Sequence, residues 1–265
     1  MSRAVSSIAG AYSATGGAWQ SGPGQIYDTL AQELVDRCPG GVSGRRVLDI
    51  GAGTGAASRA ATAAGAGGVV AVDVATGMLL HDASSRPPAV TGDALALPFP
   101  QETFGAVVAA FSLNHLTDPA SGLAEAGRVL RGGGGLIASA YALDDTHPAK
   151  AAVEAACRDA GWTPEPWYLE LRNDAIPRLA TEASAAEVAS VLPGAEVATL
   201  KVSFPGLTPA DLVAWRLGMA QVAAFVGRRT PSELDAIGAT AVELLGPRPP
   251  ALVRSCITIT WRRPG

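Results

Sequence analysis

The fold is decided by one stretch, Val47-Leu48-Asp49-Ile50-Gly51-Ala52-Gly53-Thr54-Gly55. An apolar run that leads directly into glycines at alternate positions is typical of a strand that ends in a nucleotide-binding turn. Gly51, Gly53 and Gly55 lack the Cβ atoms that would keep a ligand away from the backbone. The helix expected from Ala56 would present its unpaired N–H groups and its positive dipole end to that ligand. The stretch therefore predicts a nucleoside-cofactor site.

Asp49 stands immediately before this turn. A carboxylate beside the loop suits a cationic ligand better than a pyrophosphate. The loop also satisfies the dinucleotide pattern G-x-G-x-x-A over residues 51–56, which leaves a nicotinamide cofactor open at this point.

Strands and helices are predicted to alternate on both sides of the turn. Strands are expected at 46–50, 68–72, 89–91, 106–111 and 134–140, and helices at 56–64, 77–84 and 120–130. This alternation predicts a parallel sheet with helices on both faces and a ligand at the carboxyl ends of its strands. A helix over 25–37, after a glycine-punctuated segment, is expected to cover the core.

The regular alternation of strands and helices ends after residue 141. Helices are predicted at 148–161, 165–180, 183–192 and within 209–245, and strands at 196–204 and 253–261. The added helices are expected to form a substrate lid. The predicted division is an N-terminal cover segment (1–44), a cofactor-binding core (45–141), and lid insertions with the last core helix and strands (142–265).

The composition of the chain indicates which kinds of molecule the protein binds. The chain has 265 residues, 48% of them hydrophobic, a net charge of -4 and no basic run interleaved with aromatics, so a small molecule is expected rather than nucleic acid or an anionic membrane. Three widely spaced cysteines favour a reducing compartment, and no signal segment or long apolar span is evident, so a cytoplasmic location is expected. The oligomeric state is not indicated.

Four ordered motifs give the sequence a family resemblance. Val47 to Gly55, Val69 to Asp73, Gly92 to Phe99 and Phe111 to Leu116, followed by Arg128 to Gly134, resemble the motifs of class I S-adenosylmethionine-dependent methyltransferases. The similar branch acts on small molecules and includes ubiquinone and menaquinone C-methyltransferases (methyltransferase type 11). Gly132 stands where the family usually has proline.

The resemblance implies a Rossmann-like fold and a reaction. The fold would be a doubly wound, seven-stranded, mostly parallel α/β sheet with helical lid insertions. The reaction would pass the methyl group of S-adenosylmethionine to a small, apolar metabolite by in-line displacement. Two other functions stay open on the same fold: a cyclisation or rearrangement without methyl transfer, and a nicotinamide-dependent oxidoreduction.

The resemblance also implies roles for individual residues. Asp73 would accept the two ribose hydroxyls, and Asp93 with the Ala94 N–H would hold the adenine. Met78 would offer its side chain to the adenine face, although a methionine on a helix also serves as core filling. The methionine end would lie at Asp49 and the glycine loop. The full cofactor set is Asp49, Gly51, Gly53, Gly55, Asp73, Val74, Met78, Asp93, Ala94 and Phe111.

His115, just past the fourth strand, is the candidate general base, or else only a wall of the pocket. The acceptor is expected at His115, Tyr12, Trp19 and Tyr141. Aromatic residues of the cover segment, Tyr27 among them, are equally consistent with simple packing.

Two further groups of residues each allow two interpretations. Asp144, Asp145 and His147 resemble metal ligands in composition, but they have no second ligand group at fixed spacing. A solvated loop and no metal are therefore expected there. Another group is expected to line an apolar acceptor pocket or to form the core of the lid: Trp162, Trp167, Tyr168, Trp215, Met219 and Phe225.

Overall fold

The structure is a computed structural model that describes residues 3–81, 83–84 and 86–265. Within these ranges the centre is a seven-stranded sheet in the order β3-β2-β1-β4-β5-β7-β6. The strands are β1 (Arg46–Ile50), β2 (Gly68–Asp73), β3 (Ala89–Thr91), β4 (Phe104–Ala110), β5 (Leu130–Tyr141), β6 (Glu196–Phe204) and β7 (Leu252–Arg262). β7 is antiparallel to β5 and β6, whereas the pairs from β3 to β5 are parallel. The predicted doubly wound, mostly parallel sheet is confirmed.

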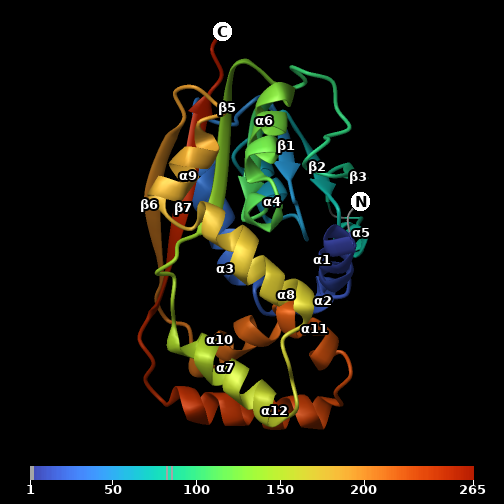
Figure 1. Cartoon of the computed structure of the whole chain (residues 1–265), viewed down its shortest axis with the longest axis vertical. Helices are drawn as coiled ribbons and strands as arrows, with labels where there is room; N and C mark the ends of the chain where they lie inside the picture. Colours follow the sequence, from blue (N-terminus) through green and yellow to red (C-terminus); the bar gives the residue numbers. More distant parts are fainter. Residues whose placement is uncertain (1–2, 82, 85) are drawn as a thin grey trace.

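Both faces of the sheet are covered by helices (Figure 1). Successive residues of β1 point to opposite faces, so Val47 packs with α3 (Gly24–Asp36) and α4 (Ala56–Ala63). Leu48 packs on the other face, with α6 (Pro119–Val129) and α9 (Glu182–Ala189). Burial on both sides explains why the sequence of β4 is a continuous apolar run.

The turn after β1 depends on a glycine. Gly51 has φ +69°, and a Cβ at this position would lie 2.2 Å from the Cβ of Ser112. Only glycine fits this close approach in the left-handed region. The turn brings the chain from β1 to α4 across the carboxyl edge of the sheet, where the loops after β2 and β4 also lie.

The N-terminal segment contains two helices that the sequence did not predict, α1 (Arg3–Ser13) and α2 (Gly16–Ser21). Both helices pack beside α5 (Thr76–Leu80). The backbone of α1 can approach α5 closely because residue 77 is glycine: a Cβ there would lie 2.2 Å from the Ser13 carbonyl oxygen. The Ser13 hydroxyl also accepts the Gly77 N–H at 3.2 Å. The predicted helix over 77–84 is shorter than expected, ending at Leu80, and residue 82 lies outside the described residues.

A helical part lies beyond the carboxyl edge of the sheet (Figure 1). It contains α7 (Pro148–Asp159), α8 (Pro166–Glu170), α10 (Pro209–Leu217), α11 (Ala220–Val226) and α12 (Pro231–Leu245). Thr208 and Thr230 start α10 and α12 with capping boxes in which each threonine precedes a proline. The predicted single helix over 165–180 is instead α8 followed by a π-helix (Leu171–Ala175) and a 3-10 helix (Ile176–Leu179).

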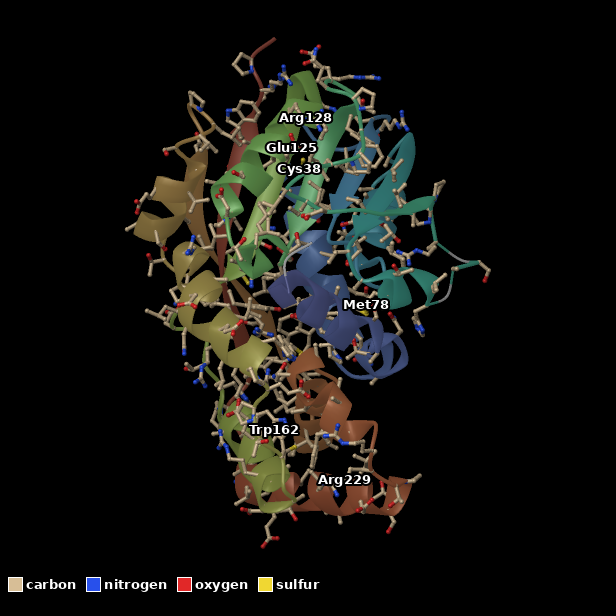
Figure 2. The ribbon with its side chains drawn as sticks, turned by 45° about the vertical axis from the view of Figure 1, so that its right-hand side comes forward. Cys38, Met78, Glu125, Arg128, Trp162 and Arg229 are labelled. Carbon is tan, nitrogen blue, oxygen red and sulfur yellow. The ribbon has the colours of Figure 1, made fainter. Side chains whose placement is uncertain are left out.

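The helical part has an apolar core of its own. Trp162 and Phe225 are buried there with Val153, Val222 and Ile237, and Figure 2 shows Trp162 in this region, far from Glu125 and Arg128 on α6. None of the helices in the described ranges combines the length and apolar character needed to cross a lipid bilayer.

Two polar side chains of the loop from β5 to α7 are buried, so the prediction of a solvated loop was wrong for Asp145 and His147. Asp145 is 7% exposed and accepts hydrogen bonds from Nε of Arg254 at 3.0 Å and Nη2 at 2.8 Å. Nζ of Lys150 lies 2.9 Å from the same carboxylate. His147 caps α7 by accepting the Ala149 N–H at 3.2 Å. These two side chains are buried where the loop joins the sheet to the helical part, while the neighbouring Asp144 is exposed.

We predict that Asp145→Asn lowers the free energy of unfolding at pH 7 by about 3–5 kcal/mol, because it leaves the buried charge of Arg254 unpaired and removes the partner of the half-buried Lys150. Burial favours the neutral carboxyl, but the guanidinium of Arg254 outweighs it and holds the pKa of Asp145 below its usual range. The stabilisation by this ion pair is therefore complete above about pH 4, the pKa of the Asp145 carboxyl in the unfolded chain. It is lost as the pH falls further, toward the lower pKa that the carboxyl has in the folded protein.

Urea unfolding of both proteins at pH 7 and at pH 3 measures this difference. The matched control is the exposed neighbour: Asp144→Asn should stay within about 0.5 kcal/mol of the wild type. Equal destabilisation by the two substitutions would show that Asp145 has no special role in joining the two parts.

Candidate functional site

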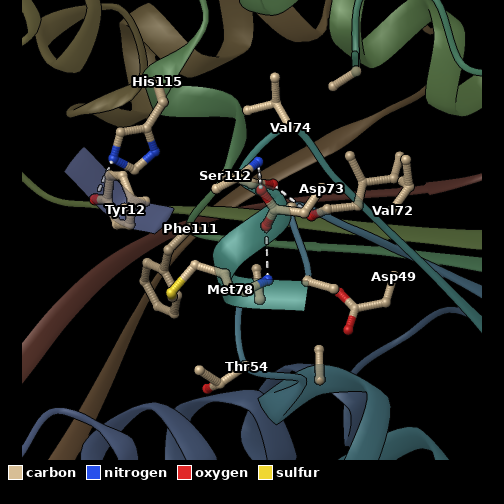
Figure 3. Close-up of a pocket in the computed structure, with 18 of the residues that line it drawn as sticks. Tyr12, Asp49, Thr54, Val72, Asp73, Val74, Met78, Phe111, Ser112 and His115 are labelled. Atoms are coloured by element: carbon tan, nitrogen blue, oxygen red, sulfur yellow. Dashed lines mark hydrogen bonds between the residues drawn. The ribbon is translucent and has the colours of Figure 1, made fainter. Parts of the chain in front are cut away.

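A pocket opens at the carboxyl edge of the sheet, under α1 and α2 (Figure 3). It contains about 1230 Å³ of empty space, counted out to the open solvent. Residues from β1, β2, β4, the loops that follow them, α1 and α3 line it. Ligands of open α/β sheets bind at this edge, outside the carboxyl ends of the strands.

Most residues predicted from the motifs line this pocket. Those with the predicted cofactor role are Asp49, Gly51, Gly53, Asp73, Val74, Met78, Asp93, Ala94 and Phe111, and those with the predicted acceptor role are Tyr12, Trp19 and His115. Gly55 does not line the pocket but precedes α4 as its N-cap, with φ +91°. Tyr141 also lies outside the lining, where its ring stacks on Phe111 with centroids 4.3 Å apart.

Asp73 ties two backbone loops together at the centre of the pocket (Figure 3). One carboxylate oxygen accepts the N–H of Gly53 at 2.7 Å, and the other accepts the N–H of Ala75 at 2.7 Å. Each oxygen keeps a lone pair for a further donor. Burial raises the pKa of Asp73, although these two N–H groups oppose the shift.

Asp49 is buried beside the glycine loop and is 1% exposed. Its carboxylate accepts the hydroxyl hydrogen of Ser58, from α4, at 2.7 Å. Burial raises the pKa of Asp49 to about 6. A cation in the pocket would favour the ionised form of this carboxyl and would bind more tightly in return.

The glycine loop leaves its inner side open to a ligand. A Cβ on Gly53 would meet only Cε of Met78, at 3.4 Å, in the described structure. The Thr15 hydroxyl, which donates to the Tyr12 carbonyl at 2.7 Å, also lies 3.5 Å from the sulfur of Met78. The methionine therefore contacts the loop from across the pocket, with Thr15 behind it.

Asp93 and Ala94 line the end of the pocket that follows β3. One oxygen of Asp93 accepts the Leu95 N–H at 2.9 Å, which fixes the turn and leaves the other oxygen free of protein hydrogen bonds in the described structure. Val74 lines the same region.

His115 and Tyr12 form a hydrogen-bonded pair inside the pocket. The Tyr12 hydroxyl lies 3.0 Å from Nε2 of His115 (Figure 3). Burial lowers the pKa of His115 to about 4, and burial raises the pKa of Tyr12 far above its usual value. Both groups are therefore neutral near pH 7, and the hydroxyl donates to Nε2 in the tautomer that carries the imidazole proton on Nδ1. His115 is on a 3-10 helix (Leu113–His115) after β4, whereas Tyr12 is on α1.

Several pocket residues were not predicted. Ile8 and Ala9 line the pocket from α1, and Ser112 lines it from the loop after β4. The Ser112 hydroxyl donates to the Ile50 carbonyl at 2.7 Å and so fixes this loop against β1. Ile8 and Tyr12 are four residues apart on one helix face, a spacing that could have pointed to α1.

The residues that line the pocket carry negative charge only, with Arg86 just behind the lining, where it donates to the Gly53 carbonyl at 3.3 Å. The described lining residues include three carboxylates, Asp49, Asp73 and Asp93, and neither lysine nor arginine. Such a pocket suits a cationic ligand and disfavours a pyrophosphate. Among the described residues, no three His, Cys, Asp or Glu side chains gather closely enough to hold a metal ion.

Comparison with known proteins agrees with the motifs. A family model described as a methyltransferase domain matches residues 48–138. The demethylmenaquinone methyltransferase of Renibacterium salmoninarum is 40% identical over 119 residues, which are 44% of this chain and 48% of that protein. The chain thus spans about half the length of this curated relative.

The similarity to solved structures covers more of this chain than the similarity to the curated relative does. The phosphoethanolamine N-methyltransferase 2 of Haemonchus contortus aligns with a TM-score of 0.54 and 17% identity, covering 89% of this chain and 53% of that chain. The [4+2]-cyclase SpnF aligns with a TM-score of 0.54 and 17% identity, covering 90% and 82%. At such identities the likeness concerns the fold alone. Residues 48–138 are thus similar to a methyltransferase domain, and the chain shares the fold of these solved proteins.

Proposed function

We propose that the protein transfers the methyl group of S-adenosylmethionine to a small, predominantly apolar acceptor. The observation that carries the proposal is the lining with Asp49, Asp73 and Asp93 and no described lysine or arginine. The ammonium and sulfonium groups of this cofactor are cationic, so the carboxylates favour its binding. A nicotinamide dinucleotide would bring a pyrophosphate into the same acidic pocket.

The residues of the pocket fit the parts of the cofactor. Asp73 would accept the ribose hydroxyls on its remaining lone pairs. Asp93 and the Ala94 N–H would hold the adenine, and Met78 would pack on its face. Asp49 and the open side of Gly53 would receive the methionine end, whose charge the ionised Asp49 would balance.

S-adenosylmethionine supplies an electrophilic methyl carbon, which passes to the acceptor as the bond to sulfur breaks and the sulfur keeps the electron pair. The protein would align the acceptor atom opposite that bond and exclude water, which together supply several kcal/mol in such reactions, on the order of 7 or more in the best cases. Tyr12 and Trp19, which line the pocket from the N-terminal helices, would provide this cover.

His115 would act as general base when the acceptor atom carries a proton. In the tautomer with the proton on Nδ1, Nε2 would accept the proton of an acceptor hydroxyl that takes the place of the Tyr12 hydroxyl, 3.0 Å away. Because the imidazole is neutral above a pKa of about 4, it needs no prior deprotonation near neutral pH. The low pKa also makes it a weak base, so an acceptor that is itself acidic suits it best.

The relative's name, demethylmenaquinone methyltransferase, supports an apolar aromatic acceptor. The helical part, with its apolar core around Trp162 and Phe225, would serve as the lid over this acceptor. Incubation with methyl-labelled S-adenosylmethionine and candidate hydroxylated aromatics tests the proposal, with mass spectrometry for labelled product and S-adenosylhomocysteine. A protein protected against heat by NAD and not by S-adenosylhomocysteine would be an oxidoreductase instead.

We predict that Asp73→Asn weakens the binding of S-adenosylhomocysteine by about 1.5–3 kcal/mol, because charge-assisted hydrogen bonds to the ribose are lost. Isothermal titration calorimetry measures the change. Asp36→Asn, at an exposed position on α3, is the matched control and should bind as the wild type does. Unchanged affinity in the Asp73 variant would remove this residue from the cofactor site.

The binding of S-adenosylhomocysteine should depend on pH through Asp49. Burial raises the pKa of Asp49 to about 6, so the carboxyl is ionised above this pH and protonated below it. The ammonium group binds the ionised form, so affinity should hold above pH 6 and fall below it, approaching about tenfold per pH unit. Asp49→Asn should remove this part of the dependence.

Calorimetry between pH 5 and pH 8 provides the measurement. The control ligand is 5′-deoxy-5′-methylthioadenosine, which has the nucleoside but no ammonium group. An identical pH dependence for the two ligands in the wild type would contradict the assignment of the ammonium to Asp49.

His115→Ala should lower kcat by roughly a hundredfold for an acceptor that must lose a proton, the usual range for a general base. Tyr12→Phe should cost less, because the acceptor replaces the Tyr12 hydroxyl. Since the pKa of His115 is about 4, the wild-type rate should show no limb from His115 between pH 5 and pH 8. Steady-state kinetics across this range separates the roles: a pocket wall would change KM and leave kcat close to normal.

A further inference from the structure

Four aromatic residues line the pocket as a continuous series of rings. Tyr12 comes from α1, Trp19 from α2, Tyr27 from α3 and Phe111 from the residue after β4. The ring centroids lie 5.7 Å apart for Tyr12 and Trp19, 4.8 Å for Trp19 and Tyr27, and 5.6 Å for Tyr27 and Phe111. We call these four residues the aromatic arc.

The rings of the aromatic arc are inclined to one another. Their planes meet at 58° for Tyr12 and Trp19, 46° for Trp19 and Tyr27, and 84° for Tyr27 and Phe111. Rings that stack flat would cover each other's faces, and none of these three pairs does so. The four side chains therefore bound the pocket like the sides of a box.

The aromatic arc and the acidic residues of the lining favour the same kind of ligand. Asp49, Asp73 and Asp93 line the pocket, with neither lysine nor arginine among the described lining residues. The face of an aromatic ring carries negative partial charge and attracts a cation, most strongly in tryptophan. Aliphatic side chains would fill the same space without this attraction. The composition of the lining therefore favours a cationic group beside the rings.

The aromatic arc lies close to Asp73. Trp19 packs in one buried cluster with Ala75, whose N–H donates to the Asp73 carboxylate at 2.7 Å. Tyr12 and Tyr27 pack against the same cluster. Burial, the neighbouring Tyr27 and the charge of Asp73 all raise the pKa of Tyr12, so the arc and this carboxylate interact across the pocket.

The proposed cofactor contacts define where a cation would lie. The ribose is assigned to Asp73 and the ammonium group to Asp49. The sulfur of S-adenosylmethionine joins the ribose to the amino-acid chain, so it would lie between these two carboxylates. It would therefore adjoin the part of the arc that is close to Asp73, which contains Tyr12 and Trp19.

We propose that the aromatic arc binds the sulfonium of S-adenosylmethionine through cation–π contacts, so that the site prefers the charged cofactor to its product. The inference rests on the proposed methyl transfer and deepens it. When the methyl group leaves, the sulfur keeps the electron pair and becomes a neutral thioether. The arc then loses its attraction for the sulfur, which favours release of S-adenosylhomocysteine.

The first test compares S-adenosylmethionine and S-adenosylhomocysteine by calorimetry on the full chain at pH 7. Trp19→Leu should weaken the binding of S-adenosylmethionine roughly 3- to 30-fold more than that of S-adenosylhomocysteine, the range of cation–π contacts. Trp19→Phe should keep part of the preference, because it keeps a ring. The matched control is Ile8→Ala, at an aliphatic lining residue of α1, which should leave the ratio of the two affinities unchanged.

Fluorination of tryptophan separates cation–π binding from packing. All five tryptophans lie in the described ranges, and Trp19 is the one that lines the pocket. Fluorine atoms withdraw electron density from the ring face and change its shape little. In protein made with mono-, di- and trifluorinated tryptophan, the affinity for S-adenosylmethionine should fall at each step, and that for S-adenosylhomocysteine should stay within about twofold. Trp19→Phe protein made in the same way should show no such trend.

The fluorinated proteins keep the Trp19 side chain, so they decide the matter even if Trp19→Leu does not fold. Equal effects of fluorination on the two ligands, or none on either, would overturn this inference alone. A trend for tetramethylammonium binding to the protein loaded with S-adenosylhomocysteine, without one for S-adenosylmethionine, would assign the arc to a cationic acceptor and also overturn it. Failure of the wild type to bind either cofactor form would count against the proposed function first.

Discussion

The carboxylate of Asp73 is the constraint on which the pocket depends. By accepting the N–H groups of Gly53 and Ala75, it fixes the turn after β1 to the turn after β2. These turns come from adjacent parallel strands, so their positions are set by the sheet and then adjusted by one side chain. The glycine loop is thereby open toward the ligand, and Met78 on the following helix faces it across the pocket. Loss of this carboxylate would loosen the loop as well as remove a ligand contact.

Two electrostatic environments meet at the rings of Tyr27, Phe111 and Tyr141, which we call the aromatic wall. Carboxylates line the pocket on one side, and the buried guanidinium of Arg254 lies on the other, 3.8 Å from the ring centre of Tyr141. Phe111, between them, has φ +56°, a left-handed conformation that costs a non-glycine residue about 1–3 kcal/mol. The hydrogen bond from its N–H to the Ser139 carbonyl, at 3.1 Å, holds it there. This strained residue keeps opposite charges apart and presents an apolar surface to both sides.

The sequence predicted the core well because its signals are local. The run from Val47 to Gly55 specifies a buried strand and a turn within nine residues, and alternating apolar segments gave the remaining strands of the sheet. The helices α1 and α2 were missed, because their glycines weaken helix propensity and their stability comes from packing on α5. Asp145 was misjudged for a similar reason: its partner Arg254 lies more than a hundred residues later in the chain, and no spacing rule reveals that pair. The pairing of Tyr12 with His115 is equally distant in sequence.

The position of β7 has a consequence for the order of folding. β6 pairs with β7 and not with β5, so neither β5 nor β6 has its full set of neighbours until residues 252–262 are inserted between them. During synthesis the half of the sheet from β3 to β5 can form first, with β5 as an exposed edge. Arg254 arrives only with β7, and it then neutralises Asp145 and joins Tyr141. The nascent chain therefore completes its cofactor side early, whereas the opposite side of the aromatic wall exists only after the whole domain has emerged and closed.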